Sequence, residues 1–201
     1  MAVVSGGTTL IDNGALDPAV PSGKLVLLST QTASSSATLD FTSGIDSTYD
    51  SYVFKFINIH PANDNTDFLF QGSTDSGSSY GVTITSTFFR AVHDEADTTT
   101  ALSYRSGQDL AQSTSFQTIF DGVGNDNDQS FSGNLKIFNP SSSVFVKHFI
   151  INSQGYMYHN FSANYYSAGY FNDGSNAING IQFKMNSGNI DAGDICLYGI
   201  A

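Results

Sequence analysis

Ser51-Tyr52-Val53-Phe54-Lys55-Phe56-Ile57-Asn58-Ile59 is the stretch that decides the fold. Its aromatic residues, at positions 52, 54 and 56, recur with the period of a β-strand and therefore share one face. The apolar residues at positions 53, 57 and 59 supply a second apolar face. A strand that is apolar on both faces is normally covered on both. We therefore expect this strand to be packed on each side.

The same alternation, or a short apolar run between turn-forming clusters, marks further strands. They are predicted at residues 24–30, 37–42, 67–71, 80–90, 113–120, 131–138, 144–152, 156–161, 165–171, 177–185 and 195–200. No long helical stripe interrupts them, and residues 88–101 allow at most one helical turn. Closely spaced strands without helical crossovers predict an all-β fold, an antiparallel β-sandwich that is jelly-roll-like.

The composition supports the same fold class. Only 12% of the residues are charged, whereas a typical soluble domain has about 25%. The acids comprise 17 Asp and a single Glu, Glu95. Asp, Asn, Ser, Thr and Gly favour turns and are poor in helix interiors, which argues against a helical protein. Because 40% of the residues are hydrophobic and 13% aromatic, the chain can build a core and is not expected to be disordered.

The first 23 residues differ from the rest of the chain. They contain Pro18 and Pro21 but no Tyr or Phe. We expect an extended N-terminal arm over residues 1–23, with one short strand at 8–12, followed by a single sandwich domain over 24–201. Such an arm is either a disordered terminus or an assembly anchor. For an anchor, the candidate contact residues are Leu10, Ile11 and Leu16.

Charge and cysteine content exclude several function classes. The formal net charge is −11, from 18 acidic and 7 basic residues, and an acidic surface repels nucleic acid. The sequence contains no run of about 18 apolar residues, so it predicts no membrane-spanning segment. Cys196 is the only cysteine, so an intramolecular disulfide and a Cys-based zinc site are excluded.

No motif for catalysis is present. The four histidines lack the H-x-H, H-x-x-H and H-E-x-x-H spacings of local metal sites, and no G-x-S-x-G nucleophile elbow occurs. A glycosidase with paired carboxylates would have to use two of the many aspartates, and no motif selects them. We therefore predict a protein without enzymatic activity and without a cofactor, apart from calcium.

Calcium is the most plausible ion. The loop at residues 121–128 (DGVGNDND) offers hard oxygen ligands at Asp121, Asp126 and Asp128, on a glycine-containing backbone. It lacks the glycine position and the terminal Glu of an EF-hand. The alternative is a solvated acidic turn, because Asp and Asn are good turn formers.

Tyrosines and asparagines gather near the middle of the C-terminal half. The candidate residues for a glycan-binding surface or a subunit interface are Tyr156, Tyr158, Asn164, Tyr165 and Tyr166. Tyrosine rings can stack on sugar rings while amides bond hydroxyl groups, which predicts a glycan-binding surface. The same residue types are enriched at subunit interfaces, and aromatic residues also pack in cores. All three roles remain open from sequence.

Five stretches carry a resemblance to a known class of proteins. They are residues 5–17 (SGGTTLIDNGALD), 24–33 (KLVLLSTQTA), 52–61 (YVFKFINIHP), 138–142 (FNPSS) and 181–200 (IQFKMNSGNIDAGDICLYGI). Together these resemble virion structural proteins of tailed bacteriophages, especially phages of marine bacteria. The resemblance implies β-sandwich modules that are typically trimeric, and it implies no catalytic residue.

The resemblance leads to a functional hypothesis. The chain is expected to be a non-enzymatic component of a tail fibre or other surface appendage, located on the phage particle and assembled through its arm with other virion proteins. Two alternatives are a capsid decoration (cement) protein that stabilises the head, and a module that recognises a host surface glycan. A depolymerase is the enzymatic alternative, and no motif favours it.

Overall fold

The computed structural model describes residues 3–5, 7–12, 15–16 and 24–201, and every regular element within them is a β-strand. None of these residues belongs to a helix that could span a membrane. The strands are β1 (Val3–Ser5), β2 (Thr8–Asp12), β3 (Ala15–Leu16), β4 (Leu25–Thr32), β5 (Leu39–Phe41), β6 (Ser51–Pro61), β7 (Thr66–Ser73), β8 (Ile84–Asp94), β9 (Thr100–Tyr104), β10 (Gln117–Val123), β11 (Phe131–Phe138), β12 (Lys147–Met157), β13 (Phe161–Phe171), β14 (Gly180–Met185) and β15 (Ile190–Ile200). The prediction of an all-β fold is confirmed.

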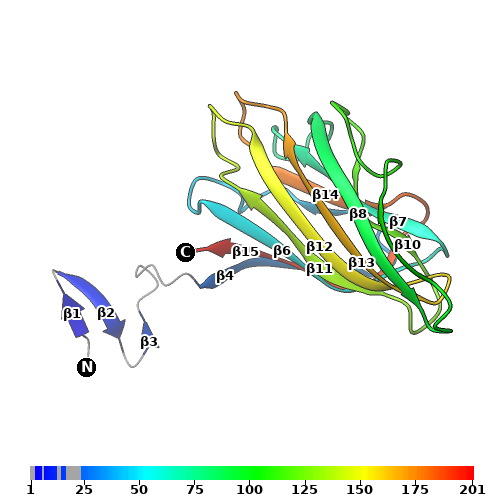
Figure 1. Cartoon of the computed structure of the whole chain (residues 1–201). Helices are drawn as coiled ribbons and strands as arrows, with labels where there is room; N and C mark the ends of the chain where they lie inside the picture. Colours follow the sequence, from blue (N-terminus) through cyan, green and yellow to red (C-terminus); the bar gives the residue numbers. More distant parts are fainter. Residues whose placement is uncertain (1–2, 6, 13–14, 17–23) are drawn as a thin grey trace.

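Strands β4 to β15 form two antiparallel layers (Figure 1). The larger layer has the order β4-β15-β6-β11-β12-β13-β8-β9, and the smaller has the order β10-β7-β14-β5. The layers join at a single pair, Val123 of β10 and Met157 of β12. The chain passes repeatedly between layers, since β5, β7, β10 and β14 alternate with strands of the larger sheet. This arrangement is the predicted jelly-roll-like sandwich.

The core lies between the layers and is rich in phenylalanine. The aromatic residues that were predicted to share one face of β6, Tyr52, Phe54 and Phe56, form its inner face and are all buried. Phe56 meets Phe68 of β7 edge to face, with ring centroids 5.5 Å apart. The same aromatic cluster continues to Phe131 of β11, which lies 5.1 Å from Phe68 and stacks on Phe120 of β10 at 4.9 Å. Aromatic pairs of this kind add to the stability that burial supplies.

The arm contains its own small sheet, in the order β1-β2-β3. Strand β2 has the bounds predicted for the short strand at 8–12. Leu10 and Ile11 lie in β2 and Leu16 in β3, but their side chains are outside the part of the chain that the structure describes. The anchoring role of these three residues therefore stays a prediction.

Three sequence-based expectations were wrong. Residues 156–161 do not form a strand of their own, because the chain reverses between Met157 and Phe161 to make the β12–β13 hairpin. Residues 88–101 contain no helical turn but the end of β8, a tight turn and the start of β9. Finally, the second apolar face expected at 53, 57 and 59 of β6 does not exist as such: Ile57 is exposed on the outer face, whereas an irregularity at Asn58 turns Ile59 into the core.

Candidate functional site

The five predicted Tyr and Asn residues do not share one surface, because neighbouring residues of β13 face opposite sides of the larger sheet. Tyr165 points inward and has no exposed surface. Its hydroxyl donates a hydrogen bond to the backbone oxygen of Asp121, 2.7 Å away, and burial raises its pKa. Tyr165 is therefore a core residue, and its prediction as a glycan or interface contact was wrong.

Tyr166, the next residue, lies on the outer face of the larger sheet. Its ring stacks on Phe89 of β8, with centroids 5.7 Å apart and planes 10° apart, and 42% of the residue is exposed. Asn152 donates to its hydroxyl at 2.9 Å, and Asn164 donates to Asn152 at 3.0 Å. A continuous row of paired residues crosses the whole sheet here: Thr30, Cys196, Lys55, Asn134, Asn152, Tyr166, Phe89 and Tyr104.

The two remaining tyrosines lie near the β12–β13 turn. Tyr156 lines a hollow with Glu95 and Gln154. Tyr158 packs its ring against that of His159, with centroids 3.6 Å apart, and both side chains face a cavity between the sheets. The structure therefore places the predicted set in the core, on the outer face and at this turn, rather than on one surface.

The three aspartates predicted to bind calcium are not gathered into a metal site. Asp121 lies in β10 and pairs with arginine, whereas Asp126 and Asp128 lie in the exposed turn that follows. Among the described residues, no group of three or more His, Cys, Asp or Glu side chains could hold a metal ion. Calcium binding stays an untested prediction without geometric support.

The cavity beside Tyr158 is the site with the most concentrated charge. It has a volume of about 370 Å³ and lies where β8 and β9 of the larger sheet face β10 of the smaller one. We call it the arginine pocket. It is lined by Asn65, Arg90, Val92, Thr99, Ala101, Arg105, Asp121, Met157, Tyr158, His159 and Phe161.

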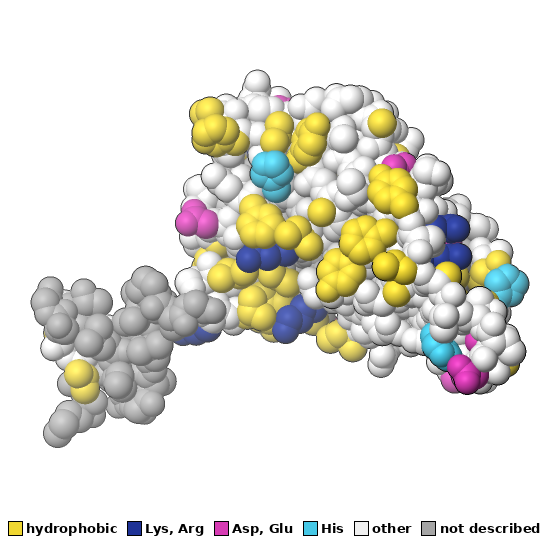
Figure 2. All heavy atoms as spheres, viewed as in Figure 1, with side chains coloured by type: hydrophobic (Ala, Val, Ile, Leu, Met, Phe, Trp, Pro, Cys, Tyr) yellow, Lys and Arg dark blue, Asp and Glu magenta, His cyan; other side chains and the backbone are white. Residues whose placement is uncertain are grey.

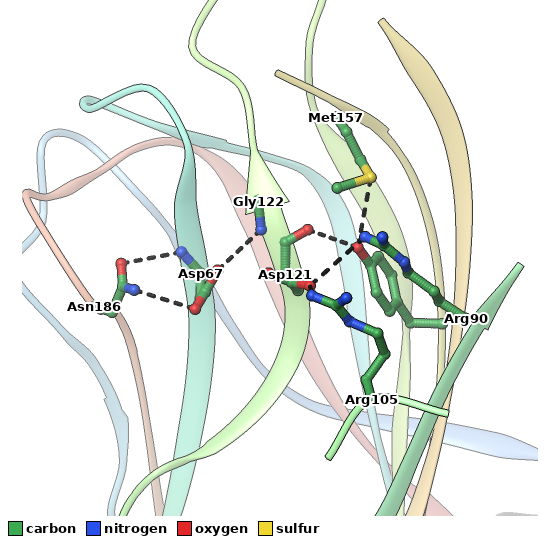
Figure 3. A network of polar contacts seen from close by, with 8 residues as sticks. Asp67, Arg90, Arg105, Asp121, Gly122, Met157 and Asn186 are labelled. Carbon is green, nitrogen blue, oxygen red and sulfur yellow. Dashed lines mark hydrogen bonds and ion pairs between the residues drawn. The ribbon is translucent and has the colours of Figure 1, made fainter. Parts of the chain in front are cut away.

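Both arginines of the chain converge on one carboxylate in this pocket (Figure 3). Arg105 Nη2 donates to Asp121 Oδ2 at 3.0 Å, and Arg90 Nη1 lies 3.8 Å from the same oxygen. Arg90 comes from the inner face of β8, and Arg105 directly follows β9. Since Asp121 belongs to the smaller sheet, this ion pair joins the two layers at the end opposite to β4.

Asp67 lies behind Asp121, on the neighbouring strand β7 (Figure 3). Its carboxylate accepts hydrogen bonds from the Gly122 N–H at 2.9 Å and from Asn186 Nδ2 at 3.1 Å. Burial raises the pKa of Asp67 to about 6, and the negative charge of Asp121 acts in the same direction. Asp67 therefore lies next to the ion pair, repelled by the charge of Asp121, and is not part of the pocket lining.

The raised pKa of Asp67 predicts a pH effect on stability. Between about pH 4 and 6 the folded protein holds this proton while the unfolded chain has lost it, so the free energy of unfolding falls as pH rises through that window. Asp67→Asn should remove this contribution, which is about 1 kcal/mol after solvent screening of a partly exposed group. Urea unfolding of both proteins at pH 4.5 and pH 7 measures it, and an equal pH dependence in the two would contradict it.

Sequence reasoning missed the arginine pocket, because its residues are far apart in the chain. One signal was present: Arg90 continues the inward-facing series Ile84, Ser86 and Phe88. A charged residue at an inward position needs a partner, which pointed to an inter-sheet ion pair. Nothing in the sequence identified Arg105 or Asp121 as the other members.

Comparisons with known proteins identify no family. No family model matches the chain, and no curated protein matches it. Two similar solved structures are crystal structures of alginate lyase A1-II′, a member of polysaccharide lyase family 7, one of them a doubly substituted form with bound substrate. Their identities to this chain are 9% and 10%, each alignment covers 76% of this chain, and both TM-scores are 0.19. The chain spans under two thirds of their lengths, 62% and 64%. Similarity at this level carries no argument about activity.

Proposed function

We propose that this chain is a non-enzymatic structural protein of a tailed-phage particle, a surface component that assembles through the outer face of its larger sheet. The observation that supports this best is the apolar character of that face. Phe89, Leu102 and Tyr104 are exposed to 41%, 77% and 55%. Ile57, Ile150 and Tyr166 add to the same surface. Figure 2 shows such apolar side chains gathered in several patches across this face.

An exposed apolar face of this kind is typical of an interaction site, because isolated soluble proteins rarely leave large apolar patches in water. The sequence of β6 points the same way. Its outward positions include Val53 and Ile57, and the fold leaves Ile57 exposed. A partner on the outer face would supply the missing cover.

Charge on the outer face fits a partner with an acidic surface. The outward positions of β6, β11, β12, β13 and β8, all of them described, carry no Asp or Glu. They carry Lys55 and Lys136, whose ammonium groups lie 5.1 Å from the Tyr198 ring and 4.6 Å from the Phe138 ring. The same face does carry one acid on β15, Asp194, which is paired with Ile57 and accepts a hydrogen bond from Thr32. Because the chain has a net charge of −11, the remainder of a second copy is acidic. We therefore propose a homo-oligomer, with a trimer as the expected state.

The resemblance to phage virion proteins and the separate sheet of the arm support a place in an appendage such as a tail fibre. A decoration protein on the capsid would use the same outer face. Locating the chain by cryo-electron microscopy in particles of the phage that encodes it distinguishes the two. Absence of the chain from purified particles would overturn the virion part of the proposal.

Phe89→Asp tests the outer face directly. A carboxylate in the middle of a buried apolar interface is strongly unfavourable, so this variant should dissociate the oligomer into folded monomers. Size-exclusion chromatography with light scattering measures the mass. Asn127→Asp, which adds the same charge in the exposed turn after β10, should leave the oligomer intact. A monomeric wild-type chain at high micromolar concentration, or an oligomeric Phe89→Asp variant, would contradict the proposal.

A further inference from the structure

We propose that the arginine pocket binds the carboxylate of an acidic sugar residue, with one or both guanidinium groups as the anion site. The pocket lies between the two sheets, on the side of β8 opposite to Phe89 and Tyr166. It is therefore distinct from the outer face, and the proposal does not depend on how the chain assembles.

The first argument is the supply of unused hydrogen-bond donors. A guanidinium group carries five N–H bonds in a planar fork that matches a carboxylate. In the pocket, the Arg105–Asp121 bond uses one of them at 3.0 Å, and Arg90 lies only within ion-pair distance at 3.8 Å. The Nε atoms of both arginines are buried and have no partner. A ligand cannot reach these enclosed Nε atoms, so a bound carboxylate would use the terminal Nη groups that the bond to Asp121 leaves free.

The second argument is local charge. Two arginines and one aspartate line the pocket, in a chain where acids outnumber bases by 18 to 7. The second carboxylate, Asp67, is directed away and occupied by Gly122 and Asn186. The side chains of Arg90 and Arg105 are exposed to only 23% and 32%, so their attraction for an anion is less screened than that of a surface lysine.

The third argument is the wall of the pocket. Tyr158, His159 and Phe161 provide aromatic surface on one side, and Asn65 and Thr99 provide polar groups that can bond hydroxyls. Aromatic faces that stack on C–H groups, next to a few polar groups, suit a sugar ring better than a free inorganic anion. The volume of about 370 Å³ lies at the lower end of the range for small-ligand sites, about 300–1,000 Å³. We therefore expect one or two sugar units to enter the pocket.

Isothermal titration calorimetry with trigalacturonate, and with neutral maltotriose as the matched probe, tests the proposal. The wild-type chain should bind trigalacturonate and not maltotriose. Arg105→Gln should weaken binding by about tenfold or more, because it removes one of the two guanidinium groups. Lys184→Gln is the charge-matched control, since Lys184 lies over the Phe116 ring outside the pocket, and its affinity should stay within about twofold of the wild type.

His159→Ala covers the case in which Arg105→Gln does not fold. His159 is exposed in the β12–β13 turn, so its loss should leave the fold intact and weaken binding several-fold through the lost aromatic wall. The proposal is overturned by equal binding of both sugars, by no binding of trigalacturonate, or by unchanged affinity in the folded variants. Cleavage of trigalacturonate, checked by mass spectrometry after the titration, would instead overturn the non-enzymatic function and leave the binding site in place.

Discussion

Replacing Phe183 with alanine is expected to lower the free energy of unfolding by about 3–5 kcal/mol, the range for truncating a buried phenylalanine. Phe183 lies in β14 and has no exposed surface. Its ring centroid is 5.1 Å from Phe54 and 5.3 Å from Phe56, both in the opposite sheet. It also lies 6.0 Å from Phe41 and 5.8 Å from Phe68 in its own sheet.

The expected loss is large because the cavity cannot collapse easily. Strand β14 is paired on both sides, with β7 and with β5. Neither neighbour can move inward without breaking backbone hydrogen bonds, so much of the space left by the ring stays empty. The cost of such a substitution rises with the volume of the cavity that remains.

Chemical denaturation followed by circular dichroism measures this effect. Phe145→Ala is the matched control, because Phe145 is 70% exposed in the loop before β12, and its stability should change by no more than about 0.5 kcal/mol. A loss below about 1 kcal/mol for Phe183→Ala would mean that the two sheets do not pack around this ring.

Asp121→Ala is expected to lower the free energy of unfolding by about 2–3 kcal/mol. The substitution leaves two partly buried guanidinium groups without their shared carboxylate. It also removes the negative charge that helps to raise the pKa of Asp67. Without the repulsion from Asp121, the Asp67 carboxylate becomes more stable, and this offsets part of the loss. The expected loss of stability is therefore smaller than that for breaking a fully buried ion pair, about 3–5 kcal/mol.

Asp126→Ala is the control for Asp121→Ala, since Asp126 is exposed in the turn that follows β10. Its stability should change by less than about 0.5 kcal/mol. The two aspartates also separate the ion pair from the calcium hypothesis. If calcium joined Asp121 and Asp126, both variants would lose similar stability and only when calcium is present. A loss confined to Asp121→Ala, and unchanged by a chelator, supports the ion pair.

The fold class could be predicted because its causes are local. A strand displays its alternation over a few consecutive residues, so the sequence placed Tyr52, Phe54 and Phe56 on one face of β6 directly. The excess of Asp, Asn, Ser and Gly marked the turns for the same reason. The prediction failed at 156–161, where aromatic residues continue through a hairpin turn and imitate a strand. There the turn is closed by a hydrogen bond from the Asn160 N–H to the Met157 carbonyl.

The sequence by itself determined that the chain forms an antiparallel β-sandwich, and that Tyr52, Phe54 and Phe56 share one face of their strand. Only the tertiary structure decided that Tyr165 is buried while Tyr166 is exposed, and that Arg90 and Arg105 meet at Asp121. It also decided that Ile57 of β6 stays exposed while Ile59 enters the core. The physical reason is that alternation depends on neighbouring residues, whereas strand partners and register depend on contacts across large sequence separations, which no local pattern records.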